Sequence, residues 1–132
     1  MADLNYPLGE HNRADVRSQT GRAADELTVD GIRTGAITAA DAAVDPATLR
    51  HQADFAERGG NPQLADNLRR GAELALFSDD DVLRFYDALR PGRSSVAELE
   101  AIAAELEAGG GERCSALVRE AIVHYRRRGL IH

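Results

Sequence analysis

Apolar residues in the second half of the chain recur at three- and four-residue spacing, the period of one face of an α-helix. The clearest run consists of Val96, Leu99, Ile102, Ala103 and Leu106. A later run consists of Cys114, Leu117, Val118, Ala121, Ile122 and Tyr125. No segment alternates with period two over a useful length, so the pattern predicts an all-α protein with essentially no sheet.

Residues typical of helix starts and stops delimit five main helices. Asp45-Pro46 and Asn61-Pro62 each combine an N-cap with proline at the first helical position. Ser78 precedes an acidic first turn, and Ser95 with Glu98 forms a capping box. We therefore expect helices over about residues 46–58, 62–76, 79–90, 96–108 and 112–128, which together form a small helical bundle.

The same spacing predicts which sides of these helices are buried. On the second helix the expected buried residues are Leu64, Leu68, Ala72 and Ala75. On the third they are Val82, Leu83, Tyr86 and Leu89, with Phe85 widening the stripe.

The N-terminal part lacks a sustained period. Residues 1–27 are expected to form an irregular arm, and residues 28–132 the helical domain. Thr28 and Thr38 are candidate N-caps of one- or two-turn helices that lead into the bundle. Tyr6-Pro7-Leu8 is the apolar anchor of the arm, and it could dock on this domain or on a partner.

Composition narrows the function classes. The 132 residues suit one domain, and 43% are apolar but only 5% aromatic. The net charge of −6 argues against nucleic-acid binding, although every basic residue other than histidine is an arginine. No apolar run is long enough to span a bilayer, and no basic-then-apolar signal opens the chain. These observations predict a cytoplasmic protein with no membrane contact.

Candidate catalytic groups are sparse. The Asp79-Asp80-Asp81 run complements a helix dipole, and Glu120 with His124 makes only half of a metal site. Cys114 lies on an apolar face with no histidine or lysine beside it to activate the thiol. We predict no catalytic, cofactor-binding or metal-binding residue, and we keep a metalloenzyme using Glu120 and His124 as a weaker alternative.

Two arginines flank a sharp corner between the third and fourth predicted helices. Arg90 and Arg93 surround Pro91. They could pair inside the domain, with the aspartates at 79–81 or with Glu98. Equally, they could bind carboxylates or carbonyls of another chain, so both interpretations stay open.

The motif set of this chain resembles the small, or gamma, subunit of adenosylcobalamin-dependent diol and glycerol dehydratases. The most specific match is the corner Leu89-Arg90-Pro91-Gly92-Arg93-Ser94, between two amphipathic helices. Other matches are Thr48-Leu49-Arg50 with Gln52-Ala53, Leu64-Ala65 with Asn67, Ala72-Glu73-Leu74, Asp79-Asp80 with Leu83 and Tyr86, and Val118-Arg119-Glu120-Ala121 with Tyr125. The similarity runs from about Thr28 to Leu130.

The resemblance implies a non-catalytic subunit that packs on a large catalytic subunit. Enzymes of that family contain two large, two medium and two small subunits and convert 1,2-propanediol or glycerol to the aldehyde and water. Adenosylcobalamin is then expected in the holoenzyme but not on this chain alone. The partners are the large and medium subunits, and we predict Tyr6, Arg50, Arg90 and Arg93 at the subunit interface. The preference between propanediol and glycerol is left open.

The chain departs from the family pattern in three places. It lacks a tryptophan usual near Asp15 and Val16, and Gly92 replaces a common aromatic residue. Only a short leader precedes Tyr6, which leaves association with a protein microcompartment open. The alternative function is a free-standing helical interaction or regulatory module, such as a helix-turn-helix DNA reader, which the acidic charge disfavours.

Overall fold

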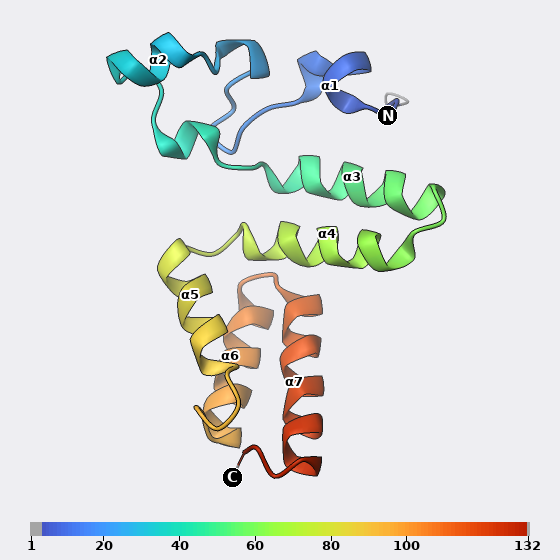
Figure 1. Ribbon diagram of the computed structural model, residues 1–132, viewed down its shortest axis with the longest axis vertical. Helices are drawn as coiled ribbons and strands as arrows, with labels where there is room; N and C mark the ends of the chain where they lie inside the picture. Colours follow the sequence, from blue (N-terminus) through green and yellow to red (C-terminus); the bar gives the residue numbers. More distant parts are fainter. Residues whose placement is uncertain (1–3, 132) are drawn as a thin grey trace. The chain divides into compact units, whose positions relative to one another are not determined.

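The computed structural model describes residues 4–131, and this part of the chain is predominantly helical (Figure 1). The α-helices are α1 (Leu8–His11), α2 (Val29–Thr34), α3 (Pro46–Arg58), α4 (Pro62–Leu74), α5 (Asp79–Ala88), α6 (Val96–Ala108) and α7 (Glu112–Arg127). Three short 3-10 helices are η1 (Arg13–Asp15), η2 (Ala24–Glu26) and η3 (Ala39–Ala42). Within residues 4–131 there is no strand, only isolated bridges between Arg17 and Ala23 and between Ser18 and Val44. The predicted all-α class is confirmed.

Packing divides the chain into an N-terminal unit, residues 1–68, and a C-terminal unit, residues 69–132. The boundary between these two units falls inside α4. The predicted division instead separated an irregular arm from the helical domain, so the two divisions describe different properties of the chain. The predicted boundary after residue 27 stays a prediction.

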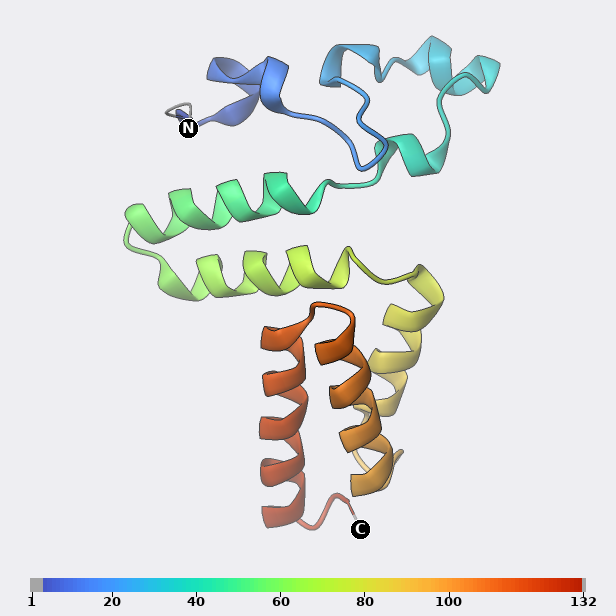
Figure 2. The ribbon, with the colours of Figure 1, turned by 180° about the vertical axis from the view of Figure 1, so that it is seen from behind.

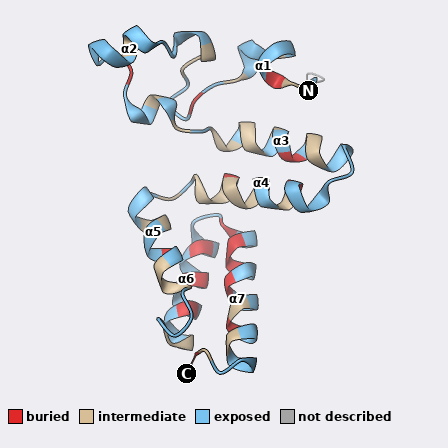
Figure 3. Cartoon of the chain, viewed as in Figure 1, coloured by how far each residue is buried: buried red, intermediate tan, exposed pale blue. Residues whose placement is uncertain are grey.

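The C-terminal unit is built around an antiparallel pair, α6 and α7, which lie side by side in both views (Figures 1 and 2). Its buried core contains Phe85, Leu99, Ile102, Ala103, Leu106, Cys114, Val118, Ile122 and Ile131. Gly109, at the end of α6, leaves room for the ring of Phe77, because a Cβ there would lie 2.5 Å from that ring. Figure 3 shows the buried residues gathered on α6 and α7.

Predicted capping residues set the helix starts. Ser78 Oγ accepts the Asp81 N–H at 3.2 Å, and the Ser95–Glu98 capping box is closed in both directions. In the N-terminal unit, Thr28 caps α2 and Asp45 caps α3. Asn61 Oδ1 accepts the Leu64 N–H at 3.1 Å at the start of α4. Local sequence therefore predicts where these helices begin.

The N-terminal unit consists of short turns followed by a helical hairpin. Asp41 closes η3 by accepting the Thr38 N–H at 2.9 Å. Helix α3 then runs antiparallel to the first residues of α4 (Figures 1 and 2). Among residues 4–68 the buried hydrophobic side chains are Leu8, Ile37, Ala53 and Ala65.

Several predicted buried faces are wrong. Leu64 is 45% exposed, while the adjacent Ala65 is fully buried. On α5, Phe85 enters the core, but Leu83 and Tyr86 are 67% and 62% exposed. The apolar residues of α5 spread over too much of the helix surface to pack against one neighbour. Leu83 and Tyr86 point to other sides of the helix than Phe85. Leu117 on α7 is also partly exposed, and α4 ends at Leu74, two residues earlier than predicted.

Candidate interface surfaces

The proline corner between α5 and α6 is held from inside the C-terminal unit. The Gly92 N–H donates to the Leu130 carbonyl at 2.9 Å, with Gly92 at φ 73°, a conformation that favours glycine. Ser94 Oγ donates to the Ala88 carbonyl at 2.9 Å, and the Tyr125 hydroxyl donates to the Leu89 carbonyl. These bonds fix the direction in which the corner presents its side chains.

Both arginines of the corner bind Asp87. Arg93 Nε lies 3.1 Å from one Asp87 oxygen, and an Arg90 nitrogen lies 3.4 Å from the other. Of the internal carboxylates considered from the sequence, Asp81 pairs with Arg84 and Glu98 binds Ser95. The internal pairing of the two arginines is instead made with Asp87. The three-residue spacing from Asp87 to Arg90 was the signal that could have identified the pair.

The pairing leaves the arginines accessible. The side chains of Arg90 and Arg93 remain 71% and 60% exposed. Exposed ion pairs contribute about 0.2–1 kcal/mol, so both guanidinium groups can bind carboxylates or carbonyls of another chain at little cost.

Tyr6 borders an open hollow in the N-terminal unit. Its ring packs edge-on against Phe55, with the centroids 5.7 Å apart, although 72% of Tyr6 is exposed. The hollow has a volume of about 620 Å³ and is lined by Tyr6, Gln52, Phe55, Ala56, Gly59, Leu64 and Leu68. No sequence pattern connected Tyr6 with α3 and α4, because residues far apart in the chain make this contact.

The four predicted interface residues are divided between the two units. Tyr6 and Arg50, which is exposed on α3, belong to the N-terminal unit, whereas Arg90 and Arg93 belong to the C-terminal unit. Arg90 and Arg93 lie close together because both pair with Asp87. It does not bring Arg50 to the hollow, whose lining lacks it.

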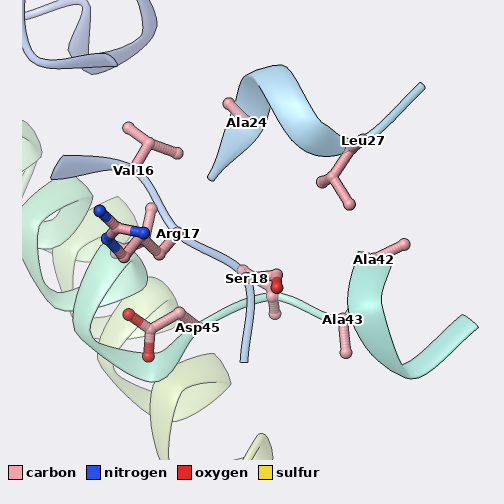
Figure 4. A pocket seen from close by; sticks show the side chains of 10 residues that line it. Val16, Arg17, Ser18, Ala24, Leu27, Ala42, Ala43 and Asp45 are labelled. Carbon is pink, nitrogen blue, oxygen red and sulfur yellow. The ribbon is translucent and has the colours of Figure 1, made fainter. Parts of the chain in front are cut away.

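A second, smaller hollow lies among the turns of the N-terminal unit (Figure 4). It measures about 210 Å³, and Val16, Ser18, Leu27 and Val44 are among its lining residues. Nearby, Asp41 accepts hydrogen bonds from the Thr38 N–H and from the Thr20 and Thr38 hydroxyls. These bonds lower the pKa of Asp41 to about 2. The aspartate thus ties η3 to the preceding turn.

The candidate chemical groups named from the sequence are Cys114, Glu120 and His124. Burial, together with the neighbouring Glu73 carboxylate, raises the pKa of the Cys114 thiol to about 12, so the thiol is neutral and a poor nucleophile. Glu120 and His124 form an exposed pair at 3.6 Å. Within residues 4–131 no group of three or more His, Cys, Asp or Glu side chains is placed to hold a metal ion. No helix in the same range is long and apolar enough to cross a membrane.

Comparison with known proteins gives consistent matches over nearly the whole chain. The sequence model of the family described as "Dehydratase small subunit" matches residues 1–132. The chain is 40% identical over 122 residues to the propanediol dehydratase small subunit of Citrobacter freundii, covering 92% of this chain and 71% of that protein. It is 41% identical over 118 residues to the propanediol dehydratase small subunit of Salmonella typhimurium, covering 89% and 68% of the two chains.

Proposed function

The chain belongs to the dehydratase small-subunit family, and on that basis we propose that it is the small subunit of a propanediol dehydratase, a carbon–oxygen lyase. The observation that carries the proposal is the family match over residues 1–132, together with identities of about 40% to two propanediol dehydratase small subunits. A helical body with exposed apolar and arginine side chains suits a subunit that works through contacts.

The finer proposal concerns the assembled enzyme. The assembled enzyme contains two copies each of a large subunit, a medium subunit and this small subunit. It converts 1,2-propanediol or glycerol to the aldehyde and water. Adenosylcobalamin supplies radical initiation when bound in the holoenzyme. The resemblance of the proline-corner motif set to this enzyme class supports these statements.

The larger hollow found within residues 4–131 does not fit the cofactor. Its lining contains one glutamine and one tyrosine among apolar residues, and it includes neither a histidine nor a cationic side chain. A corrinoid with amide and phosphate groups needs polar partners in its pocket. We therefore assign the chain no step in the reaction.

The role of this chain is to pack on the large subunit. Tyr6, Arg50, Arg90 and Arg93 are proposed to contact the partner. Their exposure and side-chain types support this role, since tyrosine and arginine are enriched at interface hot spots. A cytoplasmic location stays a prediction, and association with a microcompartment stays open.

Co-expression tests the proposal. The full chain is produced with the large and medium dehydratase subunits, and the complex is purified through a tag on the large subunit. We expect all three chains to co-elute in equal amounts and dehydratase activity with 1,2-propanediol to fall when this chain is omitted. Full activity and stability of the complex without this chain would refute the proposal.

A further inference from the structure

The hollow beside Tyr6 is formed by matched faces of two helices. On α3, Gln52, Phe55 and Ala56 lie three or four residues apart, and Gly59 follows directly after the helix. On α4, Leu64 and Leu68 are four residues apart. Such spacing places each set on one face of its helix. An apolar stripe from each helix therefore lines the same open space.

The aromatic ring in the hollow is fixed in place before anything binds. Phe55 is contacted edge-on by Tyr6, and the guanidinium carbon of Arg58 lies 4.7 Å from the Phe55 ring centroid. Tyrosine and arginine are enriched among the residues that carry most of the binding energy at interfaces. A ring already held from two sides loses little conformational freedom on binding.

The N-terminal unit does not fill this space itself. The fully buried residues of α3 and of the first half of α4 are alanines, Ala53 and Ala65, while Leu64 on the hollow stays 45% exposed. In a chain that works alone, an open apolar hollow of this size loses the stabilisation that burial of its lining would give. In a subunit, a partner can supply the missing contact.

We propose that the hollow formed by Tyr6, Phe55, Leu64 and Leu68 is the socket in which the large dehydratase subunit inserts an apolar side chain. This inference rests on the proposed function, which supplies the partner. The lining contains no charged side chain, so the inserted group is uncharged and large, such as an aromatic, leucine or methionine side chain. The same hollow is then a binding hot spot for assembly.

A charge placed in the hollow tests the socket. Leu64 is the third residue of α4, a position near the helix N-terminus where glutamate is favoured. Leu64→Glu therefore preserves the helix. It also places a carboxylate at the lining of the socket. Leu117→Glu is the matched control, because Leu117 on α7 is the same residue type and is 43% exposed. Each variant is co-expressed in full length with the large and medium subunits.

We expect Leu64→Glu to weaken association with the large subunit by about tenfold or more, and Leu117→Glu to leave it within about twofold of wild type. Circular dichroism of each free variant checks that helix content is retained. Association of Leu64→Glu equal to wild type, or equal losses in both variants, would overturn the socket.

A photocrosslinking experiment identifies which chain contacts the hollow, and it does not depend on a destabilised variant. A photoreactive benzophenone side chain replaces Gln52 in the hollow, or Glu120 on the exposed side of α7 as a control. The Gln52 probe is expected to crosslink to the large subunit and the Glu120 probe to give at most background. Crosslinks from Gln52 only to the medium subunit or to a second copy of this chain would overturn the inference.

Failure of the inference and failure of the proposed function give different results. If the wild-type chain does not assemble with the large and medium subunits, the proposed function fails. If the wild-type chain assembles but Leu64→Glu assembles equally well and Gln52 does not crosslink to the large subunit, only the socket fails.

Discussion

The two units of this chain use their apolar residues differently. In the described part of the C-terminal unit, seven large apolar side chains are buried: Phe85, Leu99, Ile102, Leu106, Val118, Ile122 and Ile131. Among residues 4–68, the buried large apolar side chains are Leu8 and Ile37. Exposed large hydrophobic side chains of that unit include Tyr6, Leu27, Val29, Ile32, Val44 and Leu64.

This difference bears on stability. Full burial of a large apolar side chain contributes about 1.5–3 kcal/mol, whereas ordering each backbone residue costs about 1–2 kcal/mol. The N-terminal unit thus has few buried side chains to offset the order of its turns. We infer that the C-terminal unit carries most of the stability of the free chain, and that the N-terminal unit gains stability when a partner covers its apolar surface.

The largest expected effect comes from the core of the C-terminal unit. Leu99 is 1% exposed, so Leu99→Ala leaves a cavity and is expected to lower the free energy of unfolding by about 2–5 kcal/mol. Leu64→Ala, at a 45% exposed position of the N-terminal unit, is expected to cost less than about 1 kcal/mol in the free chain. Urea unfolding followed by circular dichroism measures both. Equal costs would remove the contrast between the units.

A second prediction concerns the cap that holds α7 to α4 inside the C-terminal unit. The Glu73 carboxylate accepts the Arg113 N–H at 3.0 Å and the Cys114 N–H at 2.8 Å, at a helix start where Gly111 supplies no side-chain cap. Glu73→Ala is expected to lower the free energy of unfolding by about 1–2 kcal/mol.

Glu120→Ala is the control for Glu73→Ala, because Glu120 is exposed in the middle of α7, where it pairs with His124. Its expected cost is about 0.5 kcal/mol or less. The same urea titration compares the two. A loss at Glu73 no larger than at Glu120 would show that the cap contributes nothing to the stronger unit.

Sequence predicted helix ends far better than helix faces. Ser78, Ser95 and Asn61 act within one helical turn, so their capping role is visible in local sequence. Glu73 was missed because it caps a helix 40 residues further along the chain. The absence of a good cap at Gly111 was the available signal that another element had to supply one.

The face errors have a physical cause. Leu64, Leu83 and Tyr86 were expected in the core because helical periodicity records apolar positions but not what covers them. In a subunit, one apolar stripe can face its own core and another can face a partner. The corner arginines stay predicted interface residues, and their shared partner Asp87 followed only from the structure.

The third prediction separates association from stability at the proline corner. Arg90→Ala removes an exposed contact to Asp87 and is expected to lower the free energy of unfolding by about 1 kcal/mol or less. Its association with the large subunit is expected to weaken by about tenfold, because the guanidinium group is proposed to contact that chain.

Arg119→Ala is the matched control for Arg90→Ala, since Arg119 is also exposed and pairs with Glu107 at 2.8 Å. Tagged large subunit is titrated with each variant, and urea unfolding is measured in parallel. Parallel losses of stability and association in Arg90→Ala would assign the arginine an internal role and limit the proposed interface to the N-terminal unit.

The smallest effect is expected from a carboxylate in the weaker unit. Hydrogen bonds from Thr38 and Thr20 hold the pKa of Asp41 at about 2, below its ordinary value of 3.8. A carboxylate with a lowered pKa in the folded state stabilises above the unfolded pKa, and this contribution is lost as pH falls through the folded pKa. Asp41→Asn is therefore expected to lower the thermal midpoint of the N-terminal unit slightly at pH 5–7. The difference should shrink between about pH 4 and pH 2.

A difference that is unchanged over this window would mean that Asp41 acts through shape alone, and that its charge does not support the turns preceding α3.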